Sequence, residues 1–172
     1  MSLNIERRGD PLLYSVLQDL NIQFDYHEHP PAATVEEASK YWAGIDSTHC
    51  KNIFLRNHKG DKHYLVILEY RNNVNIHELE QLLKQGKLSF ASPQRMMKYL
   101  GLEPGSVSPF GLIHDTSKHV HLFLDDNLQK AERLSFHPNL NTASIIIKYN
   151  DFIRYLNWKG NSYEFIRLYA EN

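Results

Sequence analysis

Residues 100–112 have the composition best suited to holding a small polar ligand. They read Leu-Gly-Leu-Glu-Pro-Gly-Ser-Val-Ser-Pro-Phe-Gly-Leu, so three glycines and two prolines fall within thirteen positions. A helix cannot continue here, because Gly101 and Gly105 tolerate a positive φ and prolines fix φ and donate no amide. The hydroxyls of Ser106 and Ser108 and the backbone amides could then bind a ligand. A packed connection between two elements explains the same composition, and the stretch by itself favours that explanation.

Lys51 is a second residue that could do chemistry. It belongs to the strand-like run 48–57, in which alternation places Lys51 on the same face as Ile53 and Leu55. An ammonium directed toward an apolar face is unfavourable unless it reaches a partner or a polar cavity. The alternative is that the aliphatic stem covers apolar surface while the ammonium reaches water, and the local sequence favours this alternative.

Histidine and cysteine offer weaker signals for a metal or a nucleophile. His27 with His29, and His119 with His121, form two H-x-H pairs. A zinc site needs three or four ligands, and neither pair has a cysteine or acidic residue at a recognised spacing, so we expect no metal. Cys50 is the only cysteine, which excludes an internal disulfide, and no nearby histidine could activate it, so we expect an inert thiol. Phosphate-binding, dinucleotide and serine-hydrolase motifs are absent, and we expect no cofactor.

Length and charge limit the class of protein. The 172 residues suit one domain over 1–172, and the net charge of −1 lacks the basic excess of a duplex-DNA binder. The beginning of the sequence has no apolar run of signal-peptide length, and no segment approaches the length of a membrane span. We therefore expect a cytoplasmic protein with no DNA partner and no membrane contact.

Helices and strands that position these residues follow an irregular order. Caps and apolar periodicity predict helices at about 10–21, 35–42, 76–84, 93–100 and 150–158. Alternation predicts strands at about 22–26, 48–57, 62–70, 88–90, 120–125, 133–136, 143–148 and 163–168, the second and third forming a hairpin. Because regular βαβ alternation is absent, we expect a mixed or antiparallel sheet with helices packed outside it.

Five blocks of sequence, taken together, resemble the prolyl-tRNA editing deacylases, the YbaK-like relatives of the editing domain inserted in bacterial prolyl-tRNA synthetase. The blocks are Thr34-Val-Glu-Glu-Ala38, Cys50-Lys-Asn-Ile-Phe-Leu55, the stretch 100–112, Leu124-Asp125, and Phe136-His-Pro-x-x-Asn-Thr142. They follow the family's order from about His29 to Asn150. The resemblance implies an α/β (α+β mixed) fold around a curved, barrel-like sheet.

The resemblance also implies an activity and its residues. Lys51 aligns with the family's signature lysine, and Gly105-Ser-Val-Ser-Pro109 with its G-x-x-x-P loop. The implied catalytic residues are Lys51, Gly105 and Ser106; the implied substrate-binding residues are Thr34, Val107, Ser108, Pro109, Phe110, Gly111, His137, Asn141 and Thr142. The loop and the 136–142 segment look most like the branch that hydrolyses alanyl-tRNA(Pro), with the cysteine-removing branch second. One departure is His114-Asp115, where the family pattern has Asn-Asp.

Such an enzyme would be a trans-editing hydrolase that preserves translation fidelity. We expect the amides of 105–108 to hold the ester carbonyl, Val107, Pro109 and Phe110 to limit pocket size, and Lys51 to neutralise the terminal phosphate or ester end. Water activation would depend on the substrate's own ribose hydroxyl, as the resemblance implies. Lys51 and the loop are thus expected to meet at the mouth of one small cavity.

The expected partners are the acceptor end of mischarged tRNA(Pro) and, second, prolyl-tRNA synthetase. Candidates for contact with the acceptor stem are Lys84, Lys87, Arg95 and Lys98. Two other functions stay open from the sequence: a non-catalytic module that binds aminoacyl-tRNA or a synthetase, and a metal-dependent hydrolase that uses the H-x-H pairs.

Overall fold

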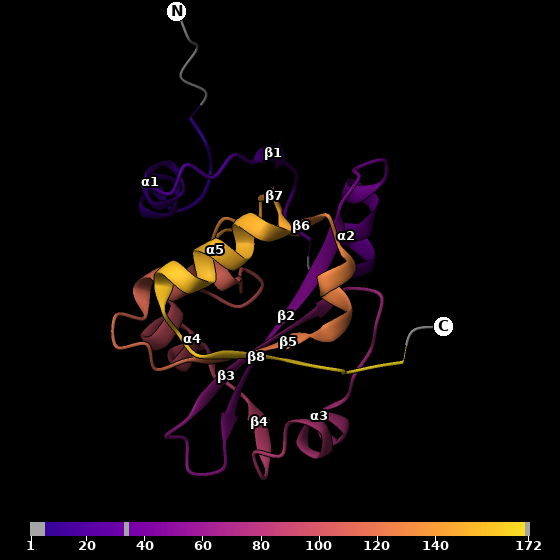
Figure 1. The fold of residues 1–172 in the computed structure, drawn as a ribbon, viewed down its shortest axis with the longest axis vertical. Helices are drawn as coiled ribbons and strands as arrows, with labels where there is room; N and C mark the ends of the chain where they lie inside the picture. The colour runs from indigo at the N-terminus through magenta and orange to yellow at the C-terminus, as the bar shows by residue number, and fades with distance from the viewer. Residues whose placement is uncertain (1–5, 33–34, 171–172) are drawn as a thin grey trace, which may run out of the picture.

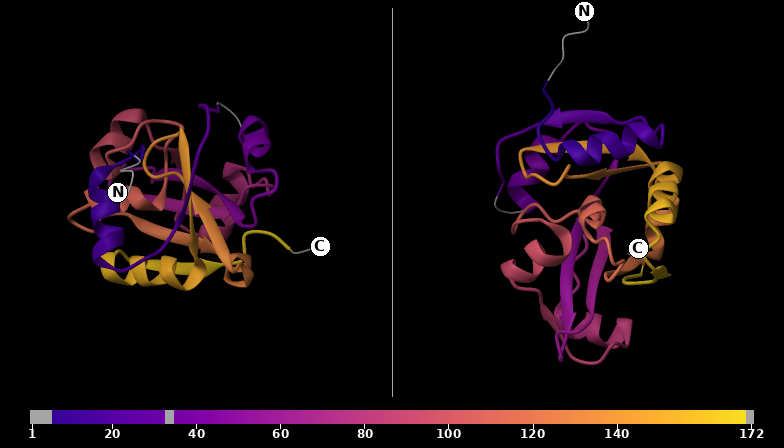
Figure 2. Two further views of the ribbon diagram at one scale, coloured as in Figure 1. Left: turned by 90° about the horizontal axis from the view of Figure 1, so that it is seen from above. Right: turned by 90° about the vertical axis from the view of Figure 1, so that its left-hand side faces the viewer.

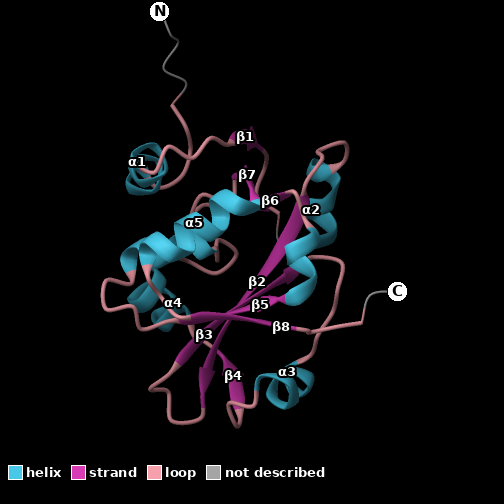
Figure 3. Cartoon of the chain, viewed as in Figure 1, coloured by secondary structure: helices cyan, strands magenta, loops and turns pink. Residues whose placement is uncertain are grey.

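An eight-stranded mixed sheet forms the centre of the fold, with helices on both sides (Figure 1, Figure 3). The computed structural model describes residues 6–32 and 35–170. The strands are β1 (Asp25–Glu28), β2 (Thr48–Asn57), β3 (His63–Glu69), β4 (Leu88–Phe90), β5 (His121–Asp125), β6 (Arg133–Phe136), β7 (Ala143–Lys148) and β8 (Tyr163–Ile166). The helices are α1 (Pro11–Asp19), α2 (Val35–Trp42), α3 (Ile76–Leu83), α4 (Pro93–Leu100) and α5 (Tyr149–Lys159), with 3₁₀ turns η1 (Pro109–His114) and η2 (Asp126–Lys130).

The strand order is β1-β7-β6-β2-β3-β5-β8, and β4 pairs with β2 outside this path. Pairs β2–β6, β3–β5 and β5–β8 are parallel, and the other pairs are antiparallel. The expected mixed α/β fold is confirmed. The sheet curves but does not close into a barrel, because β1 and β8 lie at opposite ends of the order. Figure 2 shows β1 and β7 running across the direction of the β2–β3 hairpin.

Alternation along β2 separates two apolar layers, as the sequence predicts. Cys50 and Phe54 face the larger core, which α1, α5 and η1 cover. Ile53 and Leu55 face a smaller cluster that includes Leu79 of α3. Lys51 shares the face of Ile53 and Leu55, so β2 carries the candidate lysine on the side opposite the larger core.

Two expectations about local structure need correction. The strand expected over 22–26 begins only at Asp25. The reason is that the Ile22 amide donates a hydrogen bond to the Leu17 carbonyl at the end of α1, and the Ile22 side chain is buried in the core. The second half of the 100–112 stretch is not a loop, since η1 begins at Pro109. No helix within 6–32 and 35–170 is long and apolar enough to cross a membrane.

The N-terminal helix is tied to η1 by a polar network around Asp10. The Asp10 carboxylate accepts a bond from the Leu12 amide at 3.0 Å, which caps α1, and it lies 2.5 Å from His114 Nε2 and 3.3 Å from Asn139 Nδ2. Burial acts to raise the pKa of Asp10, but the bonds from His114, Asn139 and Leu12 prevail and lower it. The departure from the family pattern at His114 is therefore explained by a partner outside the family motif.

Asp10→Ala is expected to lower the free energy of unfolding by about 1–2 kcal/mol, because α1 loses its cap and His114 its partner. Asp10→Asn should cost less, since asparagine caps a helix as well as aspartate does. The folded-state pKa lies below 3.8, so the ionic stabilisation is complete above pH 3.8 and is lost as the pH falls through the folded pKa. Urea unfolding of both variants at several pH values measures this; equal stability of Asp10→Ala and the parent chain contradicts it.

Candidate active site

Lys51 occupies an open pocket of about 330 Å³ beside α2. The pocket is lined by Glu36, Ser39, Lys51, Tyr70, Arg71 and Asn73. The Lys51 ammonium donates to the Asn72 carbonyl at 3.0 Å and to Asn73 Oδ1 at 3.1 Å. It therefore reaches polar partners, as an ammonium beside apolar residues must. The sequence offered no signal for the two asparagines, because they belong to the connection that follows β3.

Burial lowers the pKa of Lys51, while the carboxylates of Glu36 and Glu69 act to raise it. The two contacts of the ammonium within the described part of the chain are neutral oxygens, and the two carboxylates act on it from a greater distance. The cation is therefore oriented without being neutralised. Such a group is suited to hold a phosphate or the oxygen of an ester.

Helix α2 covers a face of the sheet rich in histidine and serine. The indole of Trp42 stacks on the imidazole of His49, with ring centroids 4.4 Å apart, and Tyr41 stacks on His29 at 5.7 Å. His49 is buried, and neither ring nitrogen has a hydrogen-bond partner within the described residues. Burial, with a smaller effect from His27, lowers the pKa of His49 to about 4, so this imidazole is neutral at pH 7. Sequence reasoning missed this surface, because its members come from α2, β2 and the residue that follows β1.

Four of the residues expected to bind substrate, at positions 108–111, are buried rather than exposed to solvent. Ser108 is fully buried and its hydroxyl accepts from the Phe110 amide, which caps η1. Phe110 is also fully buried, edge-on to Phe136 and Tyr155. Pro109 and Gly111 are buried as well, and a Cβ at Gly111 would lie 2.7 Å from Leu102. Any control that Pro109 or Phe110 has over pocket size must act through the residues they support.

Gly105 and Val107 are the parts of the G-x-x-x-P loop that reach the surface. Gly105 has φ +87° and is exposed, and Val107 is half-buried. The Ser106 amide already donates to the Glu103 carbonyl at 3.1 Å. The amides of Gly105, Val107 and Ser108 have no hydrogen-bond partner among residues 6–32 and 35–170. Because Ser108 is fully buried, the amides of Gly105 and Val107 are the two that are free to hold an oxyanion.

The 136–142 segment lies beside this loop, as the family pattern predicts. A Cβ placed on Gly105 would lie 3.6 Å from Asn141 Nδ2, and Asn139 Nδ2 donates to the Phe110 carbonyl. His137 Nδ1 lies 2.8 Å from the Ala143 carbonyl, so that nitrogen carries the proton. Burial lowers the pKa of His137, which leaves a neutral ring whose Nε2 can accept a hydrogen bond.

The His29 amide donates a hydrogen bond to the Thr142 carbonyl at 3.0 Å. The rings of His29 and His137 lie 5.7 Å apart. Through His29 and its stacking partner Tyr41, the 136–142 segment is connected to α2. Thr34, the remaining expected substrate-binding residue, lies outside the described residues.

Lys51 and the loop were expected to line one small cavity, but the pocket that holds Lys51 does not include the loop. None of the residues 100–112 lines it. The reason is the alternation of β2: the apolar anchors of the loop pack in the core that Cys50 and Phe54 face, and Lys51 points to the other side. The two groups are connected through α2, whose Glu36 lines the lysine pocket and whose Tyr41 contacts His29. A substrate rather than a shared pocket would therefore have to join Lys51 and the loop.

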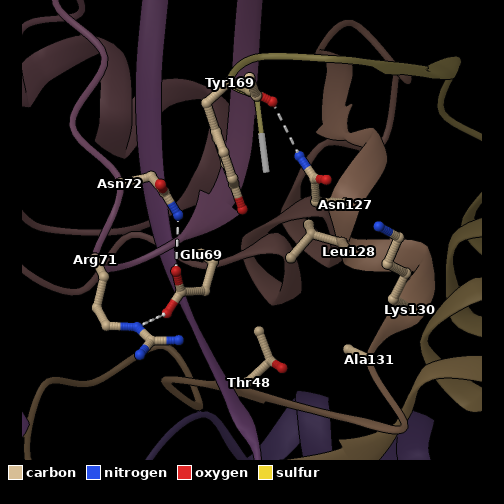
Figure 4. A pocket seen from close by; sticks show the side chains of 10 residues that line it. Thr48, Glu69, Arg71, Asn72, Asn127, Leu128, Lys130, Ala131 and Tyr169 are labelled. Atoms are coloured by element: carbon tan, nitrogen blue, oxygen red, sulfur yellow. Dashed lines mark hydrogen bonds and ion pairs between the residues drawn. The ribbon is translucent and has the colours of Figure 1, made fainter. Parts of the chain in front are cut away.

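A second polar pocket, of about 550 Å³, shares Arg71 with the lysine pocket. Figure 4 shows Glu69 between Arg71 and Asn72, bonded to them at 2.6 and 2.7 Å, and Asn127 directed toward the Tyr169 carbonyl. The Asn72 side chain is fixed by Glu69 while its carbonyl holds Lys51. Glu69 therefore orders the connection that orients the candidate lysine.

The H-x-H pairs have other partners. His29 Nε2 lies 3.1 Å from Ser144 Oγ. His119 Nε2 lies 2.9 Å from His63 Nδ1, whereas His121 contacts Ser162 and Glu164. Within residues 6–32 and 35–170 no group of three or more His, Cys, Asp or Glu side chains could hold a metal ion. Burial raises the pKa of Cys50 well above its usual range, which agrees with an inert thiol.

Comparisons with known proteins show which family the chain resembles. Residues 29–155 match the family model of the aminoacyl-tRNA editing domain. The chain is 36% identical over 152 residues to the prolyl-tRNA editing protein ProX of Acetoanaerobium sticklandii, covering 88% of this chain and 93% of that protein. It is 30% identical to prolyl-tRNA synthetase associated domain-containing protein 1 of Xenopus laevis, covering 87% and 90% of the two chains.

A crystal structure described as a candidate trans-editing enzyme for prolyl-tRNA synthetase has the same fold, with a TM-score of 0.67 at 19% identity, covering 93% of this chain and 99% of that one. The family model spans every candidate residue named above, from Thr34 to Thr142. The chain belongs to the aminoacyl-tRNA editing domain family.

Proposed function

We propose that the protein is a trans-editing hydrolase that deacylates mischarged tRNA(Pro), with alanyl-tRNA(Pro) as its main substrate. The observation that carries the proposal is the oriented but unneutralised Lys51 ammonium, in a chain 36% identical to a prolyl-tRNA editing protein. Cysteinyl-tRNA(Pro) is the alternative substrate. The acceptor end of tRNA(Pro) is the partner, with prolyl-tRNA synthetase second, and the protein would act in the cytoplasm.

The need for such an enzyme follows from size. A synthetase pocket shaped for proline rejects alanine poorly, because each missing methylene contributes only about 1–3 kcal/mol of discrimination. A second site that admits alanine but is too small for proline removes the error. Val107 and Asn141, which border Gly105 at the surface, are placed to set that size limit.

Three groups would act on the substrate. The amides of Gly105 and Val107 would hold the ester carbonyl as it gains negative charge, which in other hydrolases contributes ~3 kcal/mol per donor. His137 Nε2 would accept a hydrogen bond from the α-ammonium of the amino acid. The Lys51 ammonium would bind the terminal phosphate, and the attacking water would be activated by the ribose hydroxyl of the substrate.

Deacylation of tRNA(Pro) charged with alanine, cysteine or proline tests the proposal. We expect alanyl-tRNA(Pro) to be hydrolysed at least tenfold faster than cysteinyl-tRNA(Pro), and prolyl-tRNA(Pro) not above the rate without protein. Fastest turnover of the cysteinyl substrate supports the alternative. Binding of all three without hydrolysis contradicts an enzyme and supports a non-catalytic module.

A further inference from the structure

The end of the molecule formed by the β2–β3 turn and α4 carries an excess of positive charge. Figure 1 shows the hairpin projecting from the sheet with α4 next to it. Arg95 Nη1 donates to the Gly60 carbonyl at 2.8 Å, which fixes α4 against the turn. The surface, called the basic end below, comprises Arg56, Lys59, Lys62, Arg95 and Lys98.

A buried histidine shows that this charge is not balanced locally. His63 is 1% exposed and its Nε2 lies 3.0 Å from Arg95 Nη1. Burial lowers the pKa of His63 to about 4, and the effect is increased by His119, Arg95, Lys98 and Arg56. The charged side chains that lower this pKa are three cations, and they meet at one buried ring.

Acidic side chains near the basic end offset little of it. Asp61 lies in the turn, bonded to Asn57 Nδ2 at 2.6 Å, between Lys59 and Lys62 in the sequence. The basic end contains five cations and one turn carboxylate, so its own net charge is positive. Because the whole chain has a net charge of −1, the rest of the chain is clearly negative. Such segregation in a nearly neutral protein indicates a surface for a polyanion rather than a general solubilising charge.

A groove along α4 extends from Lys98 of the basic end to Pro104, the residue before the G-x-x-x-P loop. It is lined by Pro93, Gln94, Met97, Lys98, Leu102, Glu103 and Pro104. Lys98 therefore belongs to both surfaces, and Pro104 directly precedes Gly105. Met97 is 50% exposed in this groove. A strand of nucleic acid that starts at the basic end and follows α4 arrives at the G-x-x-x-P loop.

Two of the four cations expected from the sequence to contact the acceptor stem belong to the basic end. Arg95 and Lys98 both act on His63 of β3.

We propose that the basic end binds the sugar-phosphate backbone of the acceptor arm of the tRNA whose 3′ end follows α4 to Gly105. The inference rests on the proposed function and adds the surface that receives the body of the substrate. Duplex RNA fits better than an acidic protein, because its closely spaced phosphates can contact lysines that lie on both the turn and α4, without base-specific contacts.

Reversing two charges tests the proposal. Lys59→Glu combined with Lys62→Glu, two exposed lysines of the β2–β3 turn, should raise KM for alanyl-tRNA(Pro) at least tenfold at 150 mM salt, with kcat changed less than twofold. Losing about two phosphate contacts should also reduce the slope of log Kd against log salt concentration by about 2. Lys118→Glu combined with Lys148→Glu, which reverses two exposed lysines elsewhere, is the matched control and should change neither quantity.

Two further measurements separate this surface from the activity. An alanylated CCA oligonucleotide lacks the stem, so the reversed and parent proteins should hydrolyse it equally. Binding of uncharged tRNA, measured by fluorescence anisotropy, does not need hydrolysis and tests the surface even if the deacylase assignment fails. Equal tRNA affinity and salt dependence for the parent, reversed and control proteins overturns the proposal.

Discussion

Lys51→Ala is expected to reduce kcat/KM for alanyl-tRNA(Pro) about 100- to 1000-fold, the loss seen when one charge-stabilising donor is removed from a hydrolase. The ammonium is held by the Asn72 carbonyl and Asn73 Oδ1 rather than by a carboxylate, so its charge is available to the substrate. The fold should survive, because Lys51 is only half-buried and Asn73 is exposed to water. Single-turnover hydrolysis together with a thermal unfolding curve measures both effects.

Two comparisons make the Lys51 result specific. Lys51→Met keeps the aliphatic stem and removes the charge, so it should be as inactive as Lys51→Ala if the ammonium acts, and as active as the parent if only packing matters. Lys40→Ala removes an exposed lysine from α2 and should have no effect. Full activity of Lys51→Ala contradicts the assignment and would leave the loop and the 136–142 segment as the whole site.

The pH dependence of the Lys51-dependent rate has a defined sign. Burial lowers the pKa of Lys51 from 10.5, and the cation is the active form, so the part of the rate lost in Lys51→Met should fall as the pH rises through the lowered pKa. Glu36 acts to raise that pKa, so Glu36→Gln should move the fall to lower pH. The background ester hydrolysis, which increases with pH, is subtracted at each point.

The elements predictable from sequence are those with local signals. Asp10 with Pro11, and Ser92 with Pro93, begin α1 and α4 as expected, because a cap and a proline act on the residues next to them. Gly101 ends α4 with φ +66°. The parallel pairing of β2 with β6 had no comparable signal, since 85 residues lie between Thr48 and its register partner Leu134.

The residues of the site were predictable where they belong to a family motif. Gly105 and Asn141 were both expected to act on the substrate because their blocks belong to one family pattern, and they lie close together. The partners of Lys51 and the stack of Trp42 on His49 depend on how α2 and the 70–73 connection pack against β2, which alternation alone does not specify. Alternation did predict the face of Lys51 correctly, and that face is what separates it from the core side of the loop.

Gly105→Ala is the sharpest test of the loop and should reduce kcat about 100-fold, because a small displacement of positioned groups has an effect of this size. Gly105 has φ +87°, a conformation that strains an alanine, while the nearest atom to an added Cβ is Asn141 Nδ2 at 3.6 Å. The substitution therefore acts by moving the amides of 105–108 rather than by a clash.

Gly86→Ala is a matched control: Gly86 has φ +76°, its added Cβ meets nothing within 4 Å, and it lies in the α3–β4 connection. Both variants should lose a similar ~1 kcal/mol of stability, and only Gly105→Ala should lose activity. Equal activity of the two variants would show that the G-x-x-x-P loop does not hold the reacting ester.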